Sequence, residues 1–166
     1  MKLYHGGLTE VKTPRILATD HIGDFGTGFY TTTDIKQARR FVETKCDRAK
    51  VTRGVVSVFE IADDFLSMPT LKIKHFPSAD KEWARFVLAN RKKPDFAHDA
   101  DIVMGPVAND QVYASFTLFE NDLIDFSELI NRLKVRKLTD QVLFHSERSL
   151  LMLKYMESEV VECPPK

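Results

Sequence analysis

Two short segments near the N-terminus of this chain place aromatic side chains directly beside glycines. The first spans residues 3–7 (LYHGG), and the second spans residues 24–32 (DFGTGFYTT). Glycine lets a ligand approach the backbone closely and tolerates positive φ angles, so strands bordered by glycines are suited to line a binding pocket. We expect two neighbouring strands to hold His5 and Tyr30 face to face around a ligand. Taken singly, each side chain also suits a purely structural position.

The composition is that of one globular domain, which we assign to residues 1–166. Hydrophobic residues make up 43% of the chain and charged residues 29%, as is ordinary for a soluble domain. A formal net charge of +0 argues against bulk electrostatic binding to nucleic acid or to an anionic membrane. Cys46 and Cys163 show no disulfide or metal-ligand spacing, and the sequence contains no signal-peptide pattern and no membrane-length apolar run. These features predict a cytoplasmic protein without a metal site or a membrane span.

Hydrophobic periodicity predicts a mixture of strands and helices, and therefore the α+β class. Strands are expected at residues 2–5, 29–32, 55–61, 101–107 and 141–144. Helices are expected from Asp34, from an N-cap at Ser78 to about residue 90, at residues 123–133 and at residues 150–156.

Two further segments carry polar residues at strand ends. Asn109 and Asp110 follow the strand at 101–107, where they suit either a turn or a position facing a ligand. Asp140 and Gln141 begin the strand at 141–144, as ordinary strand-entry residues or as side chains that project into a cleft.

Several common catalytic motifs do not fit this sequence. The Gly26-Thr27-Gly28 segment is followed by a strand, whereas a Rossmann loop needs a third glycine and an immediately following helix. The chain also lacks a P-loop, a GxSxG elbow, an HExxH motif and a CxxC motif.

Taken in order, the segments resemble a bacterial domain-of-unknown-function family of the ADP-ribosyltransferase clan. The resemblance rests on residues 3–7, 24–32, the Asn90-Arg91 pair, 101–110 (DIVMGPVAND) and 141–150 (QVLFHSERSL), so it covers nearly the whole chain. It implies an α+β fold of split antiparallel sheets with flanking helices and an NAD cleft.

The wider clan uses a histidine on the first strand, a tyrosine in the next motif and a glutamate on a late strand. By this resemblance, His5 hydrogen-bonds ribose hydroxyls of NAD, the Gly6 backbone binds the nicotinamide carboxamide, and Tyr30 stacks on the nicotinamide ring. The resemblance also places Gly28, Thr31, Thr32, Asn109 and Asp110 in the NAD cleft.

The chain departs from the clan at the late strand, where Gln141, preceded by Asp140, occupies the glutamate position. A glutamine accepts a hydrogen bond from a ribose hydroxyl, but it has no negative charge and cannot act as a general base. Loss of that charge typically costs on the order of a hundredfold in rate. Three interpretations stay open: Gln141 suffices, Asp140 supplies the carboxylate, or the site binds NAD without efficient turnover.

The resemblance predicts an NAD-dependent mono-ADP-ribosyltransferase that uses NAD as a substrate, modifies a macromolecular acceptor and releases nicotinamide. In this hypothesis Gln141, Asp140, Tyr30 and His5 form the catalytic set. Activity as a toxin or effector would bring an antitoxin or immunity protein as a partner. The alternatives are an NAD glycohydrolase and a catalytically weak module that binds NAD, ADP-ribose or a protein.

Overall fold

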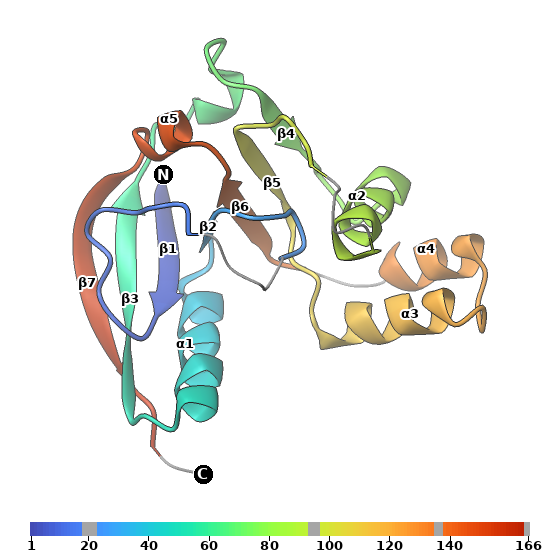
Figure 1. Cartoon of the computed structure of the whole chain (residues 1–166), viewed down its shortest axis with the longest axis horizontal. Helices are drawn as coiled ribbons and strands as arrows, with labels where there is room; N and C mark the ends of the chain where they lie inside the picture. The colour runs from blue at the N-terminus through green and yellow to red at the C-terminus, as the bar shows by residue number, and fades with distance from the viewer. Residues whose placement is uncertain (18–22, 93–96, 135–137, 165–166) are drawn as a thin grey trace.

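A computed structural model describes residues 1–17, 23–92, 97–134 and 138–164. Seven strands form one sheet in the order β4-β5-β6-β2-β1-β3-β7 (Figure 1). The strands are β1 (Lys2–Gly7), β2 (Phe29–Thr32), β3 (Arg53–Glu60), β4 (Ile73–His75), β5 (Ile102–Pro106), β6 (Asp140–Phe144) and β7 (Lys154–Glu162). The helices are α1 (Ile35–Ala49), α2 (Lys81–Lys92), α3 (Asp110–Glu120), α4 (Phe126–Lys134), α5 (Glu147–Leu150) and a 3₁₀ turn, η1 (Phe65–Ser67).

The expected α+β class is confirmed, but the sheet is mixed rather than purely antiparallel. β4 and β5 run parallel because α2 crosses over between them, whereas the other described pairs are antiparallel.

The sheet is most weakly paired between β1 and β2. The described register between these strands consists of Tyr4 opposite Thr32. In contrast, β1 pairs with β3 along its whole length, and β2 pairs with β6 along its whole length. Two blocks, β4-β5-β6-β2 and β1-β3-β7, therefore meet along a short junction that we call the β1–β2 seam.

Helix α1 packs on the β1-β3-β7 block (Figure 1). Its buried face consists of Ala38, Val42 and Cys46. Asp34 caps the helix by accepting a hydrogen bond from the Lys36 amide at 2.8 Å, which confirms the predicted start. Gln37 connects the helix to the sheet, because its Oε1 accepts a hydrogen bond from the Thr32 hydroxyl at 3.0 Å.

The other block is covered by α2, α3 and α4, which group together beside β5 in Figure 1. Trp83 of α2 is fully buried and stacks on Phe116 of α3, with 5.9 Å between ring centroids. The Trp83 indole N–H donates to the Pro106 carbonyl at 3.0 Å. Phe25 is buried in the same core cluster, so the segment before β2 is anchored against these helices.

A second core lies on the opposite face of the sheet. It is built on Leu3, Phe29, Phe59, Val142 and Phe144, against which Val11 and Ile16 from the segment after β1 are packed. A third, smaller cluster between α1 and the β3–β7 pair contains Cys46 and Cys163 as free, buried thiols.

The helix expected at residues 150–156 is wrong. The chain there forms the end of α5 and then the long strand β7. The apolar residues are spaced as in a helix, but β7 pairs with β3 and its register shifts at Val58/Phe59. Such a bulge interrupts the two-residue alternation by which a strand is recognised.

Three other features differ from the sequence predictions. β4 and α3 were not anticipated, because a three-residue strand has too little pattern and Asn109-Asp110 also suits a turn. The N-cap of α2 is Asp80 rather than Ser78, since the Asp80 carboxylate accepts from the Trp83 amide at 2.9 Å.

Among the described helices, none is long and apolar enough to cross a bilayer.

Gly6 allows α1 to approach β1. A Cβ atom at Gly6 would lie 2.7 Å from the Ala38 carbonyl oxygen and 3.1 Å from Val42 Cγ2. We expect Gly6→Ala to lower the free energy of unfolding by about 1–3 kcal/mol through overpacking, as measured by urea denaturation. Gly7→Ala is the control, because the nearest atom to its Cβ, at 3.3 Å, belongs to a loop; equal losses would contradict this account.

Candidate functional site

The buried carboxylate of Asp24 is the centre of a polar cluster. Asp24 is 6% exposed, and its Oδ2 accepts from the Ala108 amide at 3.0 Å and from Gln141 Nε2 at 2.9 Å. Its Oδ1 accepts from the Tyr113 hydroxyl. Burial, followed by the negative charge of Asp24, raises the pKa of Tyr113 and keeps its hydroxyl a donor. Asp24 thereby links the β5–α3 connection, α3 and β6.

Gln141 projects from β6 into this cluster and is 8% exposed. Because a carboxylate only accepts hydrogen bonds, the amide nitrogen of Gln141 must face Asp24. The same nitrogen lies 3.5 Å from the Pro106 carbonyl. Among the described residues, none donates to Gln141 Oε1. The side chain is thus fixed with its acceptor atom directed away from Asp24.

Tyr30 lies on β2, two residues before Thr32, which is the residue opposite Gln141 of β6. Its hydroxyl donates to the Gly26 carbonyl at 2.6 Å and accepts from the Phe25 amide at 3.1 Å. Burial raises the pKa of Tyr30, with a smaller contribution from Asp24. A Cβ at Gly23 would lie 2.5 Å from the Tyr30 hydroxyl, so a glycine is needed where the loop passes the ring.

Two histidines hold the loop that carries Asp24. His98 Nε2 lies 2.7 Å from the Phe25 carbonyl, and His145 Nδ1 lies 2.5 Å from the Thr27 carbonyl. The two rings are 4.4 Å apart. Burial lowers the pKa of His98, and His145 adds to this effect. Both rings act as donors here, because carbonyl oxygens only accept.

Asn90 supports the same loop from α2. This residue is buried, and its Nδ2 donates to the Phe86 carbonyl at 2.9 Å. A Cβ at Gly26, where φ is +98°, would lie 3.1 Å from Asn90 Oδ1. The loop therefore needs glycine here both for its conformation and for its contact with Asn90.

His5 bridges the β1–β2 seam. Its Nδ1 donates to the Tyr30 carbonyl at 2.7 Å, and its ring stacks on Phe29 at 4.3 Å. Burial lowers its pKa from 6.5 to about 4, opposed by the Tyr30 carbonyl and aided by the Lys45 charge. The ring is therefore neutral at pH 7, with a proton on Nδ1 and a lone pair on Nε2.

The strand register assigns these side chains to two faces of the sheet. Thr32 is opposite Gln141, and Tyr30 is opposite Leu143, so Tyr30 and Gln141 point to the same face. His5 points to the other face, where Phe29 belongs to a separate core cluster. The expectation that the His5 and Tyr30 rings face each other is therefore wrong, since their link runs through the Tyr30 backbone.

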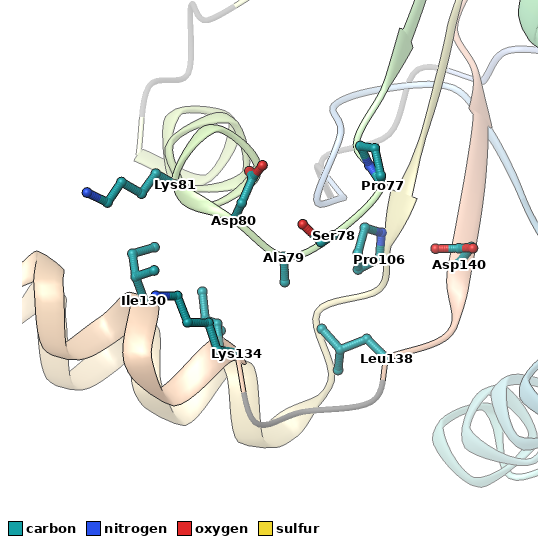
Figure 2. Close-up of a pocket in the computed structure, with 11 residues that line it drawn as sticks. Pro77, Ser78, Ala79, Asp80, Lys81, Pro106, Ile130, Lys134, Leu138 and Asp140 are labelled. Carbon is teal, nitrogen blue, oxygen red and sulfur yellow. The ribbon is translucent and has the colours of Figure 1, made fainter.

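Asp140 alternates with Gln141 along β6 and points to the face opposite Tyr30. Burial raises the pKa of its half-buried carboxyl, and His75 opposes this effect. Asp140 borders a cavity of about 520 Å³ between the Pro77–Lys81 segment, Pro106 and α4 (Figure 2). In Figure 2, Asp140 and Lys81 lie at opposite ends of this cavity.

The remaining predicted site residues all have structural contacts. A Cβ at Gly28 would lie 2.4 Å from Leu143 Cδ1, and the Thr31 hydroxyl donates to the Val142 carbonyl at 3.1 Å. These contacts fix β2 against β6.

Thr32, Asn109 and Asp110 serve strand and helix ends. The Thr32 hydroxyl lies 2.8 Å from the Asp140 carbonyl. Asn109 caps α3 by accepting from the Val112 amide at 3.0 Å, and Asp110 is the first residue of that helix. A role in ligand binding for these residues stays a prediction.

The sequence alone indicates no role for Asp24, Tyr113 or His98. Asp24 begins the segment at residues 24–32, but nothing in its spacing points to Gln141. The local signal for Asp24 is a carboxylate directly before a core phenylalanine, which is too common to identify a partner more than a hundred residues away.

A protein-family model described as "Protein of unknown function (DUF3990)" matches residues 1–155. No curated protein and no solved structure matches the chain. The matched range contains every residue of the site, from His5 to His145.

Removing one hydrogen bond to Asp24 tests how much this cluster contributes to the free energy of unfolding. Tyr113→Phe removes one donor from a buried carboxylate, and we expect a loss of about 1–3 kcal/mol in the free energy of unfolding. Tyr155→Phe is the matched control, because its hydroxyl bonds the exposed Glu10, and we expect a loss below about 1 kcal/mol there. Urea denaturation of both variants checks the difference; equal effects would contradict the importance of the cluster.

The lowered pKa of His5 predicts a pH dependence of stability. Between pH 6.5 and about 4 the unfolded chain binds a proton at His5 that the folded chain does not, so stability falls as pH falls through this window. The loss from this group is at most about 3 kcal/mol.

His5→Gln should flatten this part of the profile, as measured by urea denaturation at a series of pH values. A His5→Gln profile as steep as that of the wild type would show that His5 is not the responsible group.

Proposed function

The chain belongs to the DUF3990 family, and we propose that it binds NAD beside the β1–β2 seam and transfers ADP-ribose to a macromolecular acceptor. The observation that carries the proposal is that Tyr30 and Gln141 share one face of the paired strands β2 and β6. Hydrogen bonds fix the orientation of both side chains before any ligand arrives. Preorganisation of this kind is what binding and transition-state stabilisation need.

Tyr30 supplies an aromatic surface for the nicotinamide ring. Its hydroxyl is held at two backbone positions, so little side-chain entropy is lost when a flat ring stacks on it. His5 acts from the other face, because its Nδ1 proton holds the Tyr30 carbonyl across the seam. In this proposal His5 aligns the strand that carries Tyr30.

Gln141 supplies an acceptor for a ribose hydroxyl through Oε1. In the reaction, the bond between ribose C1′ and the nicotinamide nitrogen breaks, and its electron pair leaves with nicotinamide. A nucleophile of the acceptor then bonds to C1′ and releases its proton to solvent. The protein contributes orientation and an electronegative environment for the positive charge that develops on the ribose.

A second candidate is a module that binds NAD or ADP-ribose without turnover. The observation in its favour is that Gln141 carries no charge and that Asp140, the neighbouring carboxylate, points to the other face. Transfer of ADP-ribose to water, which would make the protein an NAD glycohydrolase, is the remaining outcome.

The test is incubation with NAD labelled in its adenylate part, together with acceptor extract. For a transferase, we expect release of nicotinamide and label on a macromolecule. We expect Tyr30→Ala and Gln141→Ala to lower the rate by about 100-fold or more, since each removes a group facing the reacting centre. Asp140→Asn should stay within about threefold of the wild type, because its side chain points away.

Each result separates the candidates once thermal melting has shown that the variants are folded. Nicotinamide release without transfer of label indicates a glycohydrolase. A thermal shift caused by NAD without either activity indicates the binding module. Neither a shift nor nicotinamide release from the wild type would reject NAD as the ligand.

A further inference from the structure

The Asp24–Gln141 hydrogen bond joins two side chains that are both more than nine-tenths buried. Gln141 Nε2 lies 2.9 Å from Asp24 Oδ2, so the carboxylate stands directly behind the amide. The other end of that amide, Oε1, receives no donor from any described residue. The amide nitrogen of Gln141 is therefore bound to the fold, whereas its Oε1 accepts no hydrogen bond from the described residues.

We propose that Asp24 is a positioning residue that supplies, through Gln141, the negative charge that an amide lacks. A carboxylate that accepts from Nε2 draws electron density through the amide toward Oε1, which becomes a stronger acceptor for a ribose hydroxyl. The negative charge of Asp24 is separated from the bound ribose only by the Gln141 amide, and it stabilises positive charge on the ribose because little water lies between them to screen it. This inference rests on the proposed function.

The surroundings of Asp24 preserve its field. Its three described partners are neutral donors from Ala108, Tyr113 and Gln141, and no described cation contacts it. The guanidinium of Arg91 lies over the Tyr113 ring at 4.6 Å and 3.9 Å from Glu120. Arg91 acts on the Tyr113 hydroxyl, whose pKa it lowers, and makes no described ion pair with Asp24.

Asp140 does not contact Gln141: its side chain alternates with that of Gln141 along β6 and borders the cavity beside α4. Asp24 reaches Gln141 from the segment that leads to Tyr30. One short stretch of chain therefore places both the charge behind Gln141 and the aromatic ring beside it.

The experiment measures nicotinamide release at saturating NAD, together with the Kd for NAD, in the full-length protein. The inference predicts that Asp24→Asn lowers kcat by about tenfold or more while Kd changes less than about threefold. Asp101→Asn is the matched control: Asp101 is also buried, at 4% exposure, but it pairs with Arg148 at the start of β5, whereas Gln141 lies opposite Gly105 near the end of that strand. Its kcat should match that of the wild type.

A charge swap separates this role from a structural one. Gln141→Glu alone sets two carboxyls together, which raises the pKa of the introduced group, so its rate should increase with pH where the wild type is flat. In the double variant Asp24→Asn/Gln141→Glu, that dependence should move to lower pH and kcat should return to within about threefold of the wild type. If Asp24 had only a structural role, Asp24→Asn would lower the melting temperature and kcat would not recover in the double variant.

The outcomes are distinguishable. If the wild type turns over NAD and Asp24→Asn stays within threefold of its kcat, the role of Asp24 is rejected and the proposed function stands. An unchanged pH profile in the double variant also rejects the role of Asp24. If the wild type neither binds NAD nor releases nicotinamide, the proposed function fails and the inference fails with it.

Discussion

The buried carboxylate of Asp24 is the interaction on which the rest of the site depends. Removing a carboxylate from water costs several kcal/mol unless donors replace its hydration. Those donors come from Ala108, Tyr113 and Gln141, which lie on three segments far from Asp24 in the chain. All of them must be in place before the charge is tolerated. The fold therefore couples the helices over β5 to the start of β6, and the adjacent Phe25 is carried into the core by the same segment.

Side chains rather than backbone pairing hold the two blocks of the sheet together. At the β1–β2 seam the described register is the Tyr4–Thr32 pair, but His5 crosses to the Tyr30 carbonyl. Gln37 of α1 accepts from the hydroxyls of Thr32 in β2 and of Thr139 directly before β6, and so joins the helix of one block to the other block. A seam closed by side chains requires fewer hydrogen bonds to be broken if the blocks move apart than a full ladder would. A movement of the two blocks relative to each other on ligand binding would therefore cost the least free energy at the β1–β2 seam.

The sequence was most informative where structure is local. The α+β class, the strand at 29–32 and the start of α1 followed from periodicity and capping chemistry, because these depend on neighbouring residues. The helix predicted at residues 150–156 is wrong because the leucines there have helical spacing, but most of this segment pairs with β3 as part of β7. Tyr30 and Gln141, which the sequence singled out, share a face, but the Asp24–Gln141 and His5–Tyr30 contacts are non-local. No spacing rule connects residues that meet only because several strands have the correct order and register.

A glutamine backed by an aspartate differs physically from a glutamate at the same position. A single glutamate facing the ligand would titrate and would need its own desolvation to be offset by groups in the cleft. An amide does not titrate, and the carboxylate behind Gln141 is stabilised by donors that belong to the fold. Under the proposed function, the acceptor strength of Gln141 would depend on the integrity of distant packing, including the helix that carries Tyr113. Under the proposed function, activity and folding would be more tightly linked in this chain than in one whose charge sits at the surface of the cleft.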